Sequence, residues 1–430
     1  MRKNKKVEFL GEKYNNICLN IDKPLNITSN IGTKLNGAAN SPVIKINSDN
    51  VCISNLNIIA NSLKGESDGI LIKNCKNIII FNNTITNNLN SSKTSGYDNG
   101  STILPGKGIK IISSENIEIN QNTVKSFESG IYNEYSKNLS INGNTLKLNN
   151  YGIKYGFGSS NTEISNNAII DNIGWYVMNV PEGPRGYGIF LNNSAVNITI
   201  SHNNISNNYL GISLDANNTT GIVITSNLIA DNSLEGIRFN APYDLAEDAV
   251  EPIVTDNAIY RNAKGPSMMI LGEMSANPEG IYGPGENDES LRLKIGPNWY
   301  GVNQLITWNY ETGIVGVGTM CPRIKTSEIK FETIESESPG IFKINFYKNG
   351  ELATNLATFD IYATLNRNTD KETEVHFEVI NGTGTFSFNP EDFLEENNLI
   401  EISVGSILNV VDRYYEIIYS YNVPLTEIPG

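Results

Sequence analysis

The most regular feature of the chain is a repeat of apolar and polar positions with a period of 22 residues. Gly-Ile pairs begin at Gly108, Gly130 and Gly152, and the first two are followed by an Ile-x-Ile or Leu-x-Ile run and then Asn-Thr. The same frame recurs, at less regular intervals, at Gly69, Gly188, Gly211 and Gly236. A recurring unit of this size is typical of a solenoid built from stacked repeats.

The spacing of the apolar residues inside each repeat indicates short β-strands. They are separated by two positions within a run, as in Ile117 and Ile119, and by five positions between runs. A spacing of two is strand periodicity, a jump of five indicates a corner, and the helical period of 3.6 is not found. We therefore predict an all-β chain wound as a right-handed single-stranded parallel β-helix. In this register Ile119, Ile141 and Ile164 stack on one another, followed by Ile200.

Asparagine and glycine occupy fixed places in the repeat. Each copy carries an apolar-x-x-Asn motif twice, as at Ile141, Asn144, Leu146 and Asn149. Asn tolerates turn conformations, and its amide can bond the turn backbone or the Asn one coil away. The glycine before each long strand is expected to admit backbone geometry or packing that a Cβ atom would hinder. His202 falls at such a corner and is interpreted as a turn residue.

The pattern divides the chain into two parts. Residues 1–310 are predicted to form the β-helix, with insertions near 89–106 and 173–186 that both precede a Gly-Ile strand and so lie on one side of the solenoid. Residues 311–430 carry alternating segments such as GIFKINFYKNG with turn signals between them, which predicts an immunoglobulin-like β-sandwich. We expect residues 321–430 to fold alone and to give a cooperative melt.

Charge restricts the partners that the chain can bind. The formal net charge is −14, and residues 321–430 hold 18 acidic against 8 basic side chains, a net of −10. Nucleic acid is therefore disfavoured as a partner. An apolar run of 18 residues does not occur, so no membrane insertion by this chain is expected. The basic start MRKNKK lacks the apolar region of a signal peptide, so either the chain is a fragment or export does not use its own N-terminus.

The cysteines and histidines do not indicate a metal site. The four cysteines lie far apart without a C-x-x-C motif, and only His202 and His376 could join them as ligands. This spacing fits neither a disulfide framework nor a zinc site. Cys52 aligns with Ile79 in the repeat frame, so Cys52 and Cys75 are not expected to stack. No metal and no cofactor are predicted.

Two columns of outward residues form the candidate ligand-binding face. If the Ile after each glycine points inward, the second and fourth residues after each glycine point outward. Exposed aromatic rings with Asn, Asp and Arg suit a carbohydrate, which offers flat apolar faces and hydroxyl groups. The alternative is that these are ordinary solvated residues, with Trp175 packed in its own loop. The candidate ligand-binding residues are Tyr132, Glu134, Lys154, Trp175, Phe190, Asn192, Asp215 and Arg238.

The same columns were tested for catalysis. Glu134 and Asp215 share a column but lie three coils apart, roughly 14 Å at strand spacing, whereas an inverting glycosidase needs about 6.5–9.5 Å. A lyase would use Lys or Arg beside carboxylates, and Lys154, Asp215 and Arg238 are spread over four coils. An enzyme normally gathers its titratable groups. No catalytic residue is therefore assigned, and a non-catalytic protein is favoured.

Three segments carry a family resemblance: KPLNITSNIGTKLNG at 23–37, the Asn-rich coils, and IGPNWYGVN at 295–303. Together with the following sandwich they resemble the adhesin-like surface proteins of methanogenic archaea, although Tyr300 stands where that family more often has a second Trp. The coil region is also similar to NosD-like and pectate-lyase-like proteins. The resemblance implies an extracellular or cell-surface, non-catalytic module that binds a polysaccharide, a cell-surface glycan or a protein. A β-helix lyase or epimerase acting on acidic polysaccharide and a viral spike or fibre protein remain the alternatives.

Overall fold

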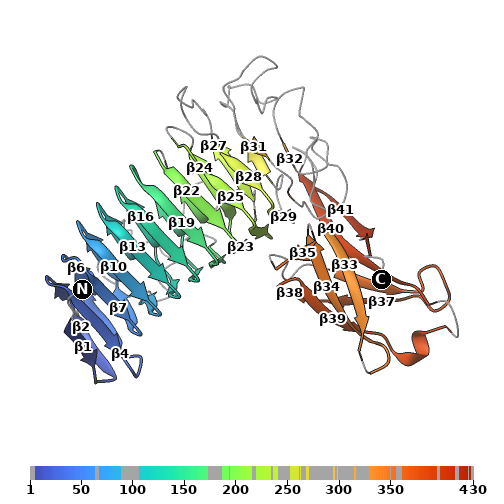
Figure 1. The fold of residues 1–430 in the computed structure, drawn as a ribbon, viewed down its shortest axis with the longest axis horizontal. Coiled ribbons are helices and arrows are strands. Elements are labelled where there is room, and N and C mark those ends of the chain that lie inside the picture. The colour runs from blue at the N-terminus through green and yellow to red at the C-terminus, as the bar shows by residue number, and fades with distance from the viewer. Residues whose placement is uncertain are drawn as a thin grey trace, which may run out of the picture.

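The computed structural model contains a long stack of parallel coils followed by a β-sandwich (Figure 1). The residues that it describes are 5–62, 67–88, 106–172, 186–240 apart from 193, 216–218 and 234–235, 252–260, 262, 268–270, 294–295, 298, 314–315, and 329–427 apart from 337, 349, 355–360, 395–397, 412–415 and 425. The two predicted insertions fall almost wholly outside these residues.

Each coil contributes one strand to each of three parallel sheets, as the register of neighbouring coils shows. Sheet A consists of β1 (Lys5–Phe9), β4 (Leu25–Ser29), β7 (Val51–Ser54), β10 (Lys76–Phe81), β13 (Glu115–Asn120), β16 (Lys137–Asn142), β19 (Ser160–Ser165), β22 (Val196–Ser201), β25 (Val223–Thr225), β28 (Ile253–Thr255) and β31 (Lys294–Ile295). Sheet B consists of β2 (Lys13–Ile17), β5 (Lys34–Ala39), β8 (Asn57–Asn61), β11 (Thr84–Asn87), β14 (Thr123–Lys125), β17 (Thr145–Lys147), β20 (Ala168–Ile170), β23 (Asn204–Ser206), β26 (Leu228–Ala230) and β29 (Ala258–Tyr260).

Sheet C carries the strands that follow the repeated glycines. It consists of β3 (Leu19–Ile21), β6 (Ile44–Ile46), β9 (Ile70–Lys73), β12 (Lys107–Ile112), β15 (Ser129–Glu134), β18 (Tyr151–Tyr155), β21 (Tyr187–Leu191), β24 (Leu210–Asp215), β27 (Ile237–Asn240), β30 (Met268–Ile270) and β32 (Ile314–Val315). The last strand, β32, follows residue 310, so the coils extend past the boundary that the sequence predicted. The predicted right-handed parallel β-helix is confirmed.

The interior of the β-helix is a set of aliphatic columns in the predicted register. Ile119 pairs with Ile141, and Ile141 pairs with Ile164. Ile164 in turn pairs with Ile200, and all four side chains are fully buried. Parallel strands repeat at about 4.8 Å, so each isoleucine packs on the next along the axis. Burial of these side chains is the main favourable contribution to the folding free energy of the β-helix.

Buried asparagines join the coils at one corner, as the sequence predicted. Asn144 Nδ2 donates to Asn167 Oδ1 in the next coil at 2.9 Å and to the carbonyl of Ile119 in the previous coil at 2.7 Å. The Asn144 backbone N–H also donates to Asn167 Oδ1. The same pattern links Asn83, Asn122, Asn144, Asn167, Asn203, Asn227, Asn257 and Asn298. These amides satisfy corner carbonyls and N–H groups that have no strand partner.

A second set of corner residues adopts the left-handed backbone conformation. From Asn83 to Asn257, the residue just before each asparagine of this ladder has positive φ, as at Asn82, Asn166 and His202. Asn is among the few residues that enter this region at low cost, and Gly143 uses the freedom of glycine at the equivalent place. His202 is therefore a turn residue, as predicted.

The repeated glycines serve packing between coils. At Gly152, an added Cβ would lie 2.5 Å from Ile169 Cγ2 and 2.6 Å from the carbonyl oxygen of Gly188. Both distances are far inside van der Waals contact. Gly152 and Ile153 are both buried, so two consecutive residues lie on the inward side at the start of the strand.

The C-terminal part forms two packed sheets, mostly antiparallel, from the segments that the sequence indicated. One sheet contains β33 (Ile329–Glu335), β34 (Ile341–Lys348), β35 (Glu351–Leu352), β38 (Val379–Ile380), β39 (Thr383–Ser387) and β42 (Thr426–Glu427). The other contains β36 (Ile361–Leu365), β37 (Thr373–Phe377), β40 (Ile400–Val411) and β41 (Glu416–Pro424). Phenylalanines such as Phe342, Phe346 and Phe386 fill the space between the sheets. A short 3₁₀-helix spans Pro390–Asp392.

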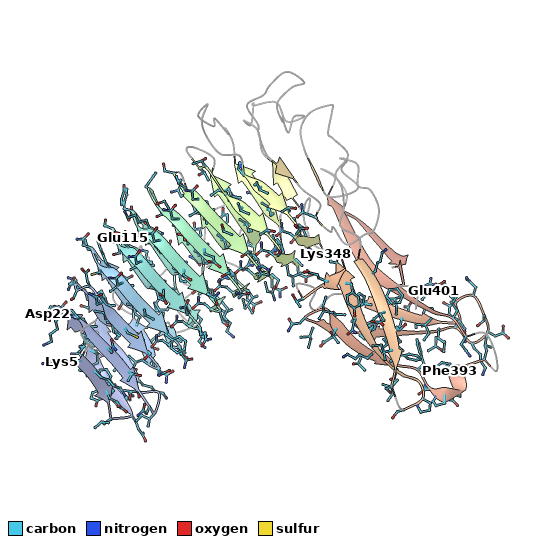
Figure 2. The ribbon with its side chains drawn as sticks, in the orientation of Figure 1. Lys5, Asp22, Glu115, Lys348, Phe393 and Glu401 are labelled. Carbon is cyan, nitrogen blue, oxygen red and sulfur yellow. The ribbon has the colours of Figure 1, made fainter. Side chains whose placement is uncertain are left out.

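The sandwich packs against the last coils of sheet B. Leu228, Ala230 and Ala258 are buried in the same apolar cluster as the sandwich core. Figure 2 shows Lys348 at this junction, where its ammonium group donates to the backbone carbonyl of Asp256. Burial lowers the pKa of Lys348 to about 8, and the nearby Asp256 carboxylate opposes that change. Independent folding of residues 321–430 stays a prediction.

Candidate glycan-binding cavity on sheet C

The two outward columns exist in the predicted register. Tyr132 pairs with Lys110 on one side and with Lys154 on the other. Lys154 then pairs with Phe190, and Ser213 follows Phe190 one coil on. Most of these side chains are partly exposed, but Ser213 is fully buried. The face is therefore open around β12, β15, β18 and β21.

A third outward column lies one position before the glycines, where the sequence analysis did not place one. Extending strict alternation backwards across the glycine would put this residue inside. Because the glycine and the following isoleucine both lie on the inward side, the residue before the glycine is left facing outward. In this column Lys107, Tyr151 and Tyr187 are partly exposed, whereas Ser129 and the next residue along, Leu210, are buried.

Three aromatic side chains from β18 and β21 pack together on this face. The rings of Tyr151 and Tyr187 stack with centroids 5.2 Å apart and an interplanar angle of 4°. Phe190 tilts against both, at 5.7 Å from Tyr151 and 5.3 Å from Tyr187. We call Tyr151, Tyr187 and Phe190 the aromatic cluster. Its half-buried rings offer an apolar surface that a sugar ring could cover.

A cavity of about 360 Å³ lies on sheet C beside the aromatic cluster. Lys154 connects the two, since its Nζ lies 4.2 Å from the centre of the Tyr151 ring. The cavity is lined by Lys107, Lys110, Ile112, Glu128, Tyr132, Glu134, Lys154, Gly156, Phe157 and Asn192. Three lysines against two glutamates give this lining a formal charge of +1 in a chain whose net charge is −14. The local field therefore favours an anionic ligand.

Glu128 holds two of the lysines in place. Its carboxylate accepts from Lys154 Nζ at 3.0 Å and lies 3.8 Å from Lys107 Nζ. The Ser129 hydroxyl donates to the same carboxylate at 2.6 Å. The side chains of Glu128 and Lys107 are 17% and 15% exposed, so these ion pairs are shielded from solvent more than ordinary surface pairs. The two ammonium groups are thus positioned at the cavity before any ligand binds.

Tyr132 and Glu134 form a second acid–base pair on β15. Burial, followed by the charge of the nearby Glu134 carboxylate, raises the pKa of Tyr132 to about 12. Gly156 in the next coil leaves room for both side chains, because an added Cβ would lie 2.9 Å from the Tyr132 hydroxyl and 3.3 Å from Glu134 Cβ. At neutral pH the phenol keeps its proton and can donate it.

The structure brings together four of the predicted site residues and separates others. Tyr132, Glu134, Lys154 and Asn192 line the cavity, while Phe190 belongs to the neighbouring aromatic cluster. Arg238 lies two coils beyond Phe190 in the same column and does not line the cavity. Trp175 lies outside the described residues, and Asp215 is described only by its backbone, which pairs with Asn240.

Glu134, Lys154, Asp215 and Arg238 lie on different coils, as the sequence predicted. Glu128 was not among the predicted site residues, because it lies at the corner just before the glycine, outside the two outward columns. It adds a carboxylate beside Lys154. With Glu128, the described part of the face contains a compact group of three lysines, two carboxylates and one tyrosine.

A larger groove of about 500 Å³ on sheet A is less suited to a charged ligand. Its outward residues include Glu118 and Glu163 and no lysine. Its rim is a row of exposed asparagines that bond one another, as Asn138 Nδ2 does with Asn116 Oδ1 at 3.1 Å. Part of the hydrogen-bonding capacity of these amides is already used between coils.

The comparison with protein families places the coil region. Residues 88–264, less than half of the chain, match the family described as "Periplasmic copper-binding protein (NosD)". No curated protein matches the chain at a significant level. Over these residues the right-handed parallel β-helix is thus similar to the NosD family, which agrees with the resemblance seen in the sequence.

Solved structures with a similar fold are distant in sequence. The enzymatically active domain of tailspike protein 2 from bacteriophage CBA120 is 10% identical, with 97% of this chain and 72% of that chain covered and a TM-score of 0.43. The A-module of mannuronan C-5 epimerase AlgE6 from Azotobacter vinelandii is 12% identical, with coverage of 75% and 86% and a TM-score of 0.39. A mutant of the periplasmic alginate epimerase AlgG is 14% identical, with coverage of 75% and 74% and a TM-score of 0.36.

The described residues do not fit a copper site. Copper in proteins prefers thiolate, thioether and imidazole ligands held close together. The Cys75 thiol is buried and bonded to the carbonyl of Lys73, Cys52 pairs with Ile79 as predicted, and Cys18 is exposed. His202 lies at a turn. Among the described residues, no group of three His, Cys, Asp or Glu side chains could hold a metal ion.

Within the part of the chain that the structure describes, no helix has the length and apolar character needed to span a bilayer.

Proposed function

We propose that the protein is an adhesin-like extracellular or cell-surface protein whose β-helix binds an acidic polysaccharide or glycan at the sheet C cavity. One observation carries the proposal: a cavity with a formal charge of +1 adjoins a cluster of three half-buried aromatic rings, in a chain that is otherwise strongly acidic. A sugar carboxylate can pair with Lys110 and Lys154, and a neighbouring sugar ring can stack on the aromatic cluster.

The proposed location outside the cytoplasm rests on two resemblances, both of which include the coil region. One is to adhesin-like surface proteins of methanogenic archaea, carried by the coil and closing motifs of the sequence. The other is the match of residues 88–264 to a family whose description includes the word periplasmic. The sandwich then acts as a spacer or a second adhesive domain.

A specific observation favours a second candidate, a lyase or epimerase acting on uronates. The Tyr132 phenol and the Glu134 carboxylate, two residues apart on β15, both line the cationic cavity, and the Glu134 charge helps to keep the phenol protonated. In a β-elimination, Glu134 takes the proton next to the substrate carboxylate, the C–O bond to the next sugar breaks as a C=C bond forms, and the leaving oxygen takes the Tyr132 proton. The proton on Glu134 then passes to the Tyr132 phenolate, which restores both groups. The lysines lower the cost of charge on the carboxylate during this step.

A glycan array with the full chain, run beside an assay for unsaturated uronate product, tests both candidates. Binding to carboxylated glycans that is weakened by Lys154→Ala and unchanged by Lys137→Ala supports the binding proposal. Lys137 is the matched control because it lies on sheet A with a side chain 55% exposed. Unsaturated product that disappears in Tyr132→Phe would establish the lyase instead. Equal binding of neutral and acidic glycans would contradict both.

A further inference from the structure

A group of polar side chains interrupts the apolar interior directly beneath the cavity. In sheet C, one inward column runs Ile111, Asn133, Tyr155, Leu191 and Leu214. Asn133 and Tyr155 are both fully buried, although aliphatic residues occupy the same column in the neighbouring coils. Asn133 lies between Tyr132 and Glu134 on β15, so its side chain points inward from the strand whose outward residues line the cavity.

A third polar residue faces this column from sheet A. Thr162 occupies a position that is Leu139 in the previous coil and Ile198 in the next. It is 4% exposed. Burial raises the pKa of the Tyr155 phenol, and Thr162 and Asn133 are the side chains close enough to oppose that rise. The three groups therefore gather around the Tyr155 hydroxyl.

These groups have hydrogen-bonding capacity that the described residues do not use. Asn133 Oδ1 and Nδ2, the Tyr155 hydroxyl and Thr162 Oγ1 are buried without a hydrogen-bond partner among the described residues. A buried polar group without a partner costs about 1–3 kcal/mol, and native proteins almost always supply a protein or water partner.

The corner beside this group is one residue longer than the corresponding corners of the two preceding coils. Ser136 follows Asn133 by three residues, whereas Ser159 follows Tyr155 by four. A serine ladder runs from the Cys75 N–H to Ser114 Oγ at 3.2 Å and from the Ser114 N–H to Ser136 Oγ at 3.1 Å. Ser159 Oγ is buried and has no partner among the described residues, so the ladder stops at this coil.

We propose that Asn133, Tyr155 and Thr162 form an internal hydration site that binds a structural water molecule, with Ser159 at its edge. A water molecule has two donors and two acceptors, so it can accept from the two hydroxyls and donate to Asn133 Oδ1. Buried waters typically make about three such bonds. The site holds β15 and the end of β18 together below Tyr132, Glu134 and Gly156. The inference does not depend on the proposed function, since its ligand is water.

High-resolution crystallography of the full chain tests the proposal directly. The expected result is density for a water within hydrogen-bond distance of at least two of the three side chains. Direct hydrogen bonds among Asn133, Tyr155 and Thr162 with no water density between them would overturn it.

Thermal unfolding of matched variants provides a second test. Tyr155→Phe removes one of the three side chains that bind the proposed water. The polar groups that remain lose part of their hydrogen bonding, so Tm should fall by about 2–4 °C. The control Tyr135→Phe makes the same chemical change at a side chain that is 57% exposed and should leave Tm unchanged. Combining Tyr155→Phe with Asn133→Leu and Thr162→Val removes every polar ligand and should recover most of the lost Tm. A combined variant that is less stable than Tyr155→Phe alone would contradict the hydration site.

Discussion

The inward and outward faces of the same strands follow different rules. On β15, β18 and β21, the inward residues after the glycines are Ile131, Ile153 and Ile189, and all are fully buried. The outward residues next to them are Tyr132, Lys154 and Phe190, which differ in charge, size and shape. Repetition inside is needed because each coil must pack on an identical neighbour. Variation outside carries no such constraint, so the non-repeating residues are where ligand recognition can be built.

This difference predicts that equal substitutions on the two faces have unequal costs. Interior changes act on packing and on hydrogen bonds that solvent cannot replace. Exterior changes away from special features usually alter stability by about 0.5 kcal/mol or less.

Ile141→Asp should have the largest effect. It places an unpaired carboxylate in a dry aliphatic column between Ile119 and Ile164, which costs about 3–5 kcal/mol or more. Chemical denaturation of the full chain measures this cost. The control Asn142→Asp makes an acidic side chain at the adjacent outward position on the other side, between Asn120 and Ser165, and should cost less than about 1 kcal/mol. Similar losses for the two variants would contradict the inward register.

Asn144→Ala tests the buried ladder at the corner. The Asn122 amide and the Ile119 carbonyl lose their partner inside the protein, so the free energy of unfolding should fall by about 2–4 kcal/mol. Asn138 belongs to the exposed row and has positive φ, which glycine accepts readily. Asn138→Gly should therefore change stability by about 0.5 kcal/mol or less in the same assay. A larger loss at Asn138 than at Asn144 would reverse the comparison.

The repeated features were predictable from the sequence, and the single ones were not. The strands, the stacking of Ile119 on Ile141 and the Asn ladder recur in many coils, so their spacing alone indicated them. Glu128 occurs in one coil only and lies at a corner, where no periodic signal marks it. Tyr151 and Tyr187 were missed because alternation breaks at the glycine, which depends on packing between coils. The contact of Lys348 with Asp256 joins residues far apart in sequence and has no local signature.

Lys348 predicts a pH dependence of the junction between coils and sandwich. Its pKa is about 8 in the folded protein, below the ordinary value near 10.5, so the unfolded state binds more protons between these values. Stability should therefore rise as the pH increases from about 8 to about 10.5. Below pH 8 the buried ammonium group is charged, and its destabilising effect is complete. Lys348→Met should raise stability by about 1–2 kcal/mol at pH 7 and remove this rise. Denaturation curves across the pH range measure both effects, and an unchanged pH slope in Lys348→Met would contradict this role.

Glu128→Gln should strengthen ligand binding slightly, whereas Lys154→Ala should weaken it. Glu128 pairs with Lys154 and Lys107. Without its charge, the three lysines face only Glu134, so the formal charge of the cavity lining rises from +1 to +2. Affinity for a carboxylated polysaccharide should rise about 3- to 10-fold, which corresponds to roughly 1 kcal/mol. A titration at low ionic strength measures this change. Weaker binding would mean that Glu128 contacts the ligand directly or that its hold on the lysines is essential.

The most direct test of the division between faces is a binding titration of Tyr132→Ala combined with Phe190→Ala, using the carboxylated glycan that the array identifies. Both side chains are outward and only half-buried, so the denaturation midpoint of the double variant should stay close to that of the parent protein. The account predicts that affinity falls at least tenfold, because the phenol of the cavity and one ring of the aromatic cluster are lost together. Unchanged affinity in a fully folded double variant would contradict the assignment of ligand binding to sheet C.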